Sequence, residues 1–149
     1  MSERIPRQQI YQLQPGLAKA LISLDKAAAD SAFSSLLVHL VKLRASQLNG
    51  CAFCQRMHAE EARHDGENQR RLDLLAAWHE VDGLFDAREQ AALRWTETLT
   101  RVAQSPVHDS EYAALAEHYS EKEIVDLTSL IIAINGWNRI AIAFHLQPL

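Results

Sequence analysis

Helical periodicity, marked by clear start signals, is the feature that most limits how this 149-residue chain can fold. A long apolar stretch from Ile124 toward Phe144 offers few polar faces, and it follows Ser120 with Glu123 three residues on, a capping-box pattern. We expect this helix to be buried nearly all round, against its own core and another subunit. No alternation of apolar and polar residues favours strands. The sequence therefore predicts an all-α protein, a compact bundle of about six to seven helices.

Several of the other helix boundaries can also be predicted from local signals. Pro15 suits the first turn of a helix, because its missing N–H has no partner there in any case. Asp30 or Ser31 can cap the next helix, and Asp86 with Glu89 forms another capping box. These signals place most of the chain in short helices joined by brief turns.

Length and composition describe one ordinary globular domain. The apolar share is 48% and the charged share is 23%, which argues against a disordered chain. Residues 1–14 contain apolar side chains without helical spacing, so we expect an extended N-terminal arm there. The single helical domain is expected to span residues 1–149.

Charge and hydropathy argue against two classes of partner. The net charge is -4 and the sequence pI is near 5.9, so no basic surface is expected for nucleic acid. No apolar run approaches the roughly 18 residues of a membrane helix, and the N-terminus lacks a secretory signal pattern. We therefore expect a cytoplasmic protein that binds neither nucleic acid nor membranes.

The strongest chemical signal is the pair Cys51 and Cys54, followed by His58. Asn49 and Gly50 tolerate left-handed backbone, so one helix should end there and another begin near Cys51. Free N–H groups and the dipole at a helix start stabilise a thiolate. His58 lies four residues after Cys54, on the same helix face. In a reducing compartment this spacing favours a catalytic or metal-binding cysteine pair over a structural disulfide.

These positions predict an enzyme, a thiol-dependent peroxidase. Cys54 would attack the peroxide and become a sulfenic acid, and Cys51 would resolve it to a disulfide. His58 would act as general base. Phe53 and Met57 can shape a small apolar pocket for an organic hydroperoxide. An external thiol reductant or a recycling protein must reopen the disulfide, and no cofactor or bound metal is expected.

Residues 43–54, together with His58, closely resemble the core of alkylhydroperoxidase D-like proteins, within the carboxymuconolactone decarboxylase superfamily. Residues 134–139 are similar to a second stretch that is common in this group. The resemblance implies an all-helical fold, assembly into homo-oligomers (trimers or hexamers) and thiol-dependent peroxidase activity.

The resemblance also implies a proton relay that includes a glutamate twelve residues before the first cysteine, where this sequence has His39. Imidazole can pass protons near neutral pH, with an unperturbed pKa of about 6.5, but it supplies no fixed negative charge. Glu61, three residues beyond His58, offers a substitute carboxylate, although a solvated surface acid is the simpler interpretation. The candidate catalytic residues are Cys54, Cys51, His58 and His39.

Other interpretations of the cysteine pair stay open. Two thiolates and an imidazole are three of the four ligands of a zinc site, and His39 or a subunit partner could supply the fourth. The dithiol could instead serve as a redox sensor in a non-catalytic oligomer, or the cysteines could simply pack in the core. A thioredoxin-like site expects a βαβ pattern that this helical chain lacks.

Overall fold

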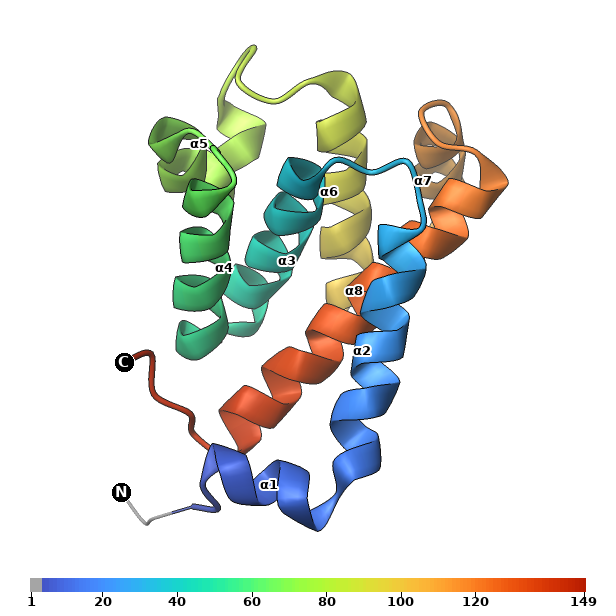
Figure 1. Ribbon diagram of the computed structural model, residues 1–149. Coiled ribbons are helices and arrows are strands. Elements are labelled where there is room, and N and C mark those ends of the chain that lie inside the picture. The colour runs from blue at the N-terminus through green and yellow to red at the C-terminus, as the bar shows by residue number, and fades with distance from the viewer. Residues whose placement is uncertain (1–3) are drawn as a thin grey trace.

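The computed structural model describes residues 4–149, which are mostly helical (Figure 1). This range holds eight α-helices, one 3-10 segment and no strand, so the all-α prediction is confirmed. The elements are α1 (Arg7–Leu13), α2 (Pro15–Ala29), α3 (Ser35–Asn49), α4 (Ala52–His64), α5 (Gln69–Leu74), the 3-10 segment (Leu75–Glu80), α6 (Ala87–Thr100), α7 (Asp109–Ala116) and α8 (Glu121–Ala143). The helix count exceeds the predicted six to seven because α1, only seven residues long, lies in the segment expected as an extended arm. None of the helices in this range combines the length and apolarity that a membrane span needs.

Both predicted capping boxes are present. Asp86 caps α6 and Ser120 caps α8, and each accepts a hydrogen bond from the backbone N–H of the glutamate three residues on. That glutamate accepts in return from the backbone N–H of the capping residue, at 3.0 Å in both boxes. Two N–H groups that the helix leaves unpaired are thus satisfied at each start.

Two helix boundaries differ from the prediction. Ser34, and not Asp30 or Ser31, caps α3, and its side chain accepts a hydrogen bond from Leu37 N at 3.1 Å. The spacing of Leu72, Leu75, Ala76 and Trp78 predicts one further helix, but α5 gives way there to a 3-10 segment with a kink inside it. At the start of α3, several residues that can cap a helix lie within five positions. At the break after α5, the helix is too short for its periodicity to define where it ends.

The N-terminal arm is not extended where the structure describes it. Residues Arg7–Leu13 form α1, in which Ile10 is buried and Tyr11 packs edge-on against Trp137 with ring centroids 6.3 Å apart. Arg4 donates from Nη1 to two carbonyls at the end of α8, at 3.2 and 3.1 Å. A helix of about two turns is marginal by itself, so these distant contacts stabilise it and no local pattern predicts it.

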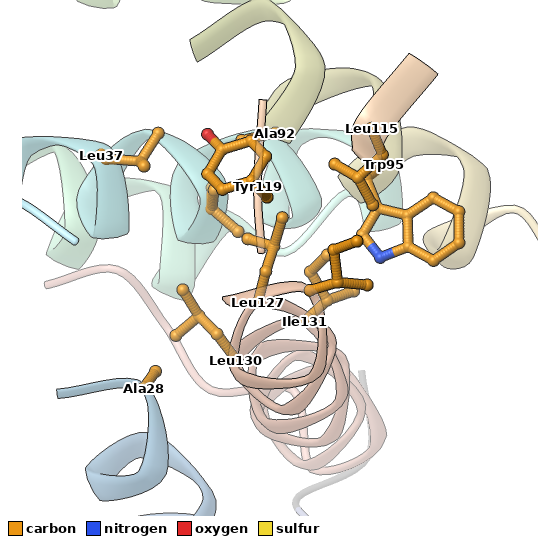
Figure 2. Close-up of a cluster of buried hydrophobic side chains, with 11 residues drawn as sticks. Ala28, Leu37, Ala92, Trp95, Leu115, Tyr119, Leu127, Leu130 and Ile131 are labelled. Carbon is orange, nitrogen blue, oxygen red and sulfur yellow. The ribbon is translucent and has the colours of Figure 1, made fainter. Parts of the chain in front are cut away.

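The core lies on both sides of α3. One cluster of buried side chains surrounds α8, where Leu127 and Ile131 lie near Leu37 of α3 and Trp95 of α6 (Figure 2). A second cluster fills the space between α3, α4, α5 and α6, and its buried members are Leu40, Leu43, Ala62, Leu72, Leu75, Trp78, Phe85 and Leu93. Because α3 contributes to both clusters, it is held firmly, and α4 follows it directly in the chain.

Helix α8 is buried on most of its surface but not all round. Val125 and Ile132, seven residues apart on one face, remain 64% and 54% exposed in the single chain. Its other faces carry ten buried residues, including Leu127 and Ile134. Burial against its own core is therefore confirmed, and contact with another subunit stays a prediction.

A buried amide anchors α8 to the end of α3. Asn138 is fully buried, accepts from Asn49 Nδ2 at 2.9 Å and donates to Ser46 Oγ at 3.0 Å. Asn49 Nδ2 also donates to Asn135 Oδ1 at 3.0 Å. Both polar atoms of the Asn138 side chain are thus paired, which a buried amide requires.

Replacing the buried amide should weaken the fold. We expect Asn138→Ala to lower the free energy of unfolding by about 2 kcal/mol, because it removes buried partners of Asn49 and Ser46. The control is Arg139→Ala, whose exposed guanidinium bonds, among residues 4–149, only to Asn135 one turn earlier, so its effect should stay within about 0.5 kcal/mol. Urea unfolding followed by circular dichroism, with the disulfide kept oxidised, measures both. Equal effects of the two variants would contradict the anchoring role.

Candidate active site

A glycine in the left-handed region joins α3 to α4. Gly50 has φ +69°, a conformation that L side chains rarely adopt, and the predicted break at Asn49 and Gly50 is confirmed. Gly50 N donates to Gln47 O at 3.2 Å, and Cys51 N donates to Ser46 O at 3.0 Å. The last turn of α3 therefore fixes the backbone at the first cysteine.

The two cysteines lie at the start of α4, as predicted. Cys51 is the N-cap residue, and its Sγ forms a disulfide with Cys54, three positions on, with an S–S distance of 2.04 Å. Cys54 N donates to Cys51 Sγ at 3.2 Å. The two residues are only 1% and 2% exposed. After reduction, the free N–H groups of this first turn would favour a thiolate.

His58 lies one helical turn after Cys54 and is buried. Its Nδ1 donates to Glu61 Oε2 at 3.2 Å, since an ionised carboxylate can only accept. Its Nε2 is buried and has no hydrogen-bond partner among the described residues. With Nδ1 carrying the proton, Nε2 is the nitrogen that can accept another one.

A cavity of about 230 Å³ adjoins the disulfide, and of its two cysteines only Cys54 lines it. The wall also includes His58 and the two residues predicted to flank the site, Phe53 and Met57. Its other members are Arg7, Tyr11, Asp25, Lys42, Glu61, Trp137, Ala141 and Leu146. Five helices (α1, α2, α3, α4 and α8) thus enclose a space that suits a small organic molecule.

The cavity wall carries charged groups as well as rings. Asp25 Oδ2 accepts from Trp137 Nε1 at 3.0 Å, and Asp25 Oδ1 lies 3.7 Å from Lys42 Nζ. The guanidinium of Arg7 lies over the ring of Phe53, 5.3 Å from its centroid. Sequence reasoning missed Arg7, Asp25 and Trp137 as cavity residues, because they come from separate helices and no local pattern joins them.

His39 does not line this cavity. Its Nε2 donates to Asp65 Oδ2 at 2.6 Å, and its Nδ1 lies 4.0 Å from Glu61 Oε2. The structure therefore brings the cysteines and His58 together, and it places His39 on the far side of the Glu61 carboxylate.

The Glu61 carboxylate makes contacts that a fully solvated surface acid would lack. Its side chain is 48% exposed, yet it lines the cavity and accepts the hydrogen bond from His58. That hydrogen bond lowers the pKa of the Glu61 carboxyl, and the charges of Lys42 and His39 act in the same direction. The spacing of three residues after His58 was the one sequence signal for this contact.

No set of metal ligands accompanies the cysteines. Within residues 4–149 no three His, Cys, Asp or Glu side chains are grouped so that they could hold a metal ion. The described residues of one chain thus offer no grouped ligand set, and a zinc site completed by a subunit partner stays a prediction.

Comparison with known sequences supports the resemblance found in residues 43–58. The model of the carboxymuconolactone decarboxylase family matches residues 15–98, more than half of the chain. An uncharacterized protein of Bacillus subtilis (strain 168), YdfG, is 39% identical over 143 residues, which cover 96% of this chain and 95% of that protein.

Solved structures agree with this relationship. A protein of unknown function from Agrobacterium tumefaciens, described as a candidate antioxidant defence protein AhpD, is 38% identical and superimposes with a TM-score of 0.88, covering 98% of this chain and 97% of that chain. A peroxidase-related protein from Ralstonia eutropha with an alkylhydroperoxidase AhpD core has the same fold, with a TM-score of 0.79 and 18% identity over 94% of this chain and 74% of that one. This chain belongs to the carboxymuconolactone decarboxylase family.

Proposed function

We propose that this protein is a thiol-dependent peroxidase that reduces small organic hydroperoxides. The observation that carries the proposal is the asymmetry of the disulfide, since Cys54 lines the cavity with His58 and Cys51 does not. A peroxide held in the cavity can therefore reach Cys54, which becomes the attacking thiol, and Cys51 becomes the resolving one.

In the first step, His58 Nε2 accepts the proton of the Cys54 thiol, and its burial without another partner leaves it free to do so. The thiolate attacks one peroxide oxygen, and the O–O bond breaks. Cys54 becomes a sulfenic acid. The alkoxide that leaves takes the proton from His58 and departs as an alcohol.

In the second step, Cys51 attacks the sulfenic sulfur of Cys54, three residues away in the same turn. The S–O bond breaks, water leaves, and the disulfide forms. The dithiol has then given two electrons to the peroxide. A thiol reductant or a recycling protein must return two electrons before the next cycle.

The relatives support this proposal to different degrees. The Agrobacterium protein, described as a candidate for antioxidant defence, is similar over nearly the whole chain at 38% identity. The Ralstonia protein, described as peroxidase-related, shares 18% identity and therefore supports the fold alone.

The two cysteines should differ in what they do when replaced. We expect Cys54→Ser to consume no hydroperoxide, because the attacking sulfur is lost. We expect Cys51→Ser to react once and stop with a sulfenic acid on Cys54. The measurement is titration of the reduced proteins with cumene hydroperoxide, followed by mapping of thiols, disulfides and dimedone adducts by mass spectrometry.

The wild-type protein in the same titration decides between the functions. Consumption of hydroperoxide together with formation of the Cys51–Cys54 disulfide supports the peroxidase. If the wild type forms no disulfide and consumes no hydroperoxide, the proposal fails. Disulfide formation that does not turn over when dithiothreitol is supplied would favour the redox sensor.

We also propose that the chain acts as a homo-oligomer, a trimer or hexamer as the resemblance implies. The exposed apolar residues Val125 and Ile132 lie on one face of α8, where an uncovered stripe would be unfavourable in water. A second copy of the chain would cover them.

A charge in this stripe should dissociate the assembly. We expect Ile132→Glu to reduce the mass in solution to that of the 16.8 kDa chain, because a carboxylate cannot be buried there without a partner. Val107→Glu is the control, as Val107 is also exposed but lies in the loop before α7. Light scattering after size-exclusion chromatography measures both masses. A monomeric wild type at micromolar concentration would refute the oligomer.

A further inference from the structure

The Glu61 carboxylate lies between two histidines from neighbouring helices. Its Oε2 accepts from His58 Nδ1 at 3.2 Å and lies 4.0 Å from His39 Nδ1. His39 Nε2 in turn donates to Asp65 Oδ2 at 2.6 Å. Imidazole and carboxylate groups thus follow one another from the buried His58 to Asp65, whose side chain is 38% exposed. The line is interrupted between Glu61 Oε2 and His39 Nδ1, which has no hydrogen-bond partner among the described residues.

The arrangement follows from the way α3 and α4 pack. The two helices lie side by side and are joined by the single turn at Gly50, so the chain reverses direction between them (Figure 1). Position 39, twelve residues before Cys51, therefore faces the end of α4 that holds Glu61 and is followed by the C-cap residue Asp65. The same pairing of helices would bring a glutamate at position 39 toward His58.

The charges around Glu61 keep it ionised. The hydrogen bond from His58 lowers the pKa of Glu61, and the positive charge of Lys42 adds to that effect. The hydrogen bond from His39 likewise lowers the pKa of Asp65, with a smaller contribution from His64. Both carboxylates are therefore negative at neutral pH.

A carboxylate on Nδ1 changes what a histidine can do. It holds the proton on Nδ1, which leaves the lone pair of Nε2 free to accept a second proton. It also stabilises the imidazolium that forms when Nε2 accepts that proton. This is the role of the aspartate in a Ser-His-Asp triad, where it orients and stabilises the histidine without taking the proton itself.

We propose that Glu61 is the residue that orients His58 and stabilises its charged form, and that His39, which Asp65 orients, attracts the Glu61 carboxylate across 4.0 Å when its imidazole is protonated. This inference rests on the proposed peroxidase function. The fixed negative charge that the resemblance places at position 39 is supplied in this chain from α4. During the reaction the proton passes from Cys54 to His58 and then to the leaving alkoxide, and Glu61 stays ionised throughout.

The test exchanges the position of the carboxylate. Glu61→Gln keeps the size and a hydrogen-bond acceptor but removes the charge, and we expect it to lower kcat for cumene hydroperoxide about 10- to 100-fold. The KM should stay within about twofold, because Gln keeps the size of this cavity-lining side chain and the lost charge acts on proton transfer. The double variant His39→Glu with Glu61→Gln returns a carboxylate to position 39, and we expect it to recover kcat to within about tenfold of the wild type.

Two further variants separate charge from structure. Glu60→Gln is the matched control, since Glu60 precedes Glu61 but pairs with Arg56 at 3.2 Å on the outer face of α4, and it should keep wild-type kcat. His39→Gln retains Glu61 and loosens its support, so its loss should be smaller, about tenfold or less. Steady-state kinetics of all four variants, with circular dichroism to confirm folding, gives the comparison.

Each outcome bears on one claim. Wild-type kcat in Glu61→Gln would overturn the inference and leave the peroxidase standing. A double variant as slow as Glu61→Gln would also overturn it, because the loss would then reflect local structure and not the missing charge. A wild type that neither consumes hydroperoxide nor forms the disulfide would overturn the proposed function itself.

Discussion

The hydrogen bonds among Asn49, Asn138 and Ser46 hold together two helices that are far apart in the sequence, and the cysteines come directly after them in the chain. Ser46 connects α8 to the first cysteine, because its hydroxyl accepts a hydrogen bond from Asn138 while its carbonyl accepts one from Cys51 N at 3.0 Å. The end of α3 therefore cannot move against α8 without moving the disulfide. An apolar replacement of this network could fill the same space, but it would not fix the register of the two helices so closely.

Burial of the disulfide limits which molecules can react with it. Cys51 and Cys54 are 1% and 2% exposed, and Cys54 lines the cavity whose wall includes α1 and α8. A thiol that reopens the disulfide through this cavity would attack Cys54, and Cys51 would leave as the thiolate. In the proposed cycle the cavity would thus direct both the peroxide and the reductant to the same sulfur, since both would enter by one route.

Local signals in the sequence were sufficient for the part of the site that lies on one helix. The break at Gly50, the helix start at the cysteines and the position of His58 one turn on all follow from neighbouring residues. Contacts between helices were not predictable in this way. The role of Arg7 in the cavity wall depends on a short helix that distant residues stabilise, and the approach of His39 to Glu61 depends on how α3 packs against α4.

A carboxylate on α4, beside His58, is positioned differently from a carboxylate at position 39 on α3. Glu61 lies three residues after His58 on one helix, so helix geometry alone sets their separation. A carboxylate at position 39 would depend on the packing of two helices, but it would be better shielded, since the side chain of His39 is 12% exposed and that of Glu61 is 48% exposed. Water screens a half-exposed charge and lets its side chain move. In the proposed arrangement His39, oriented by Asp65, would limit that motion when its imidazole is protonated, although it does not line the cavity.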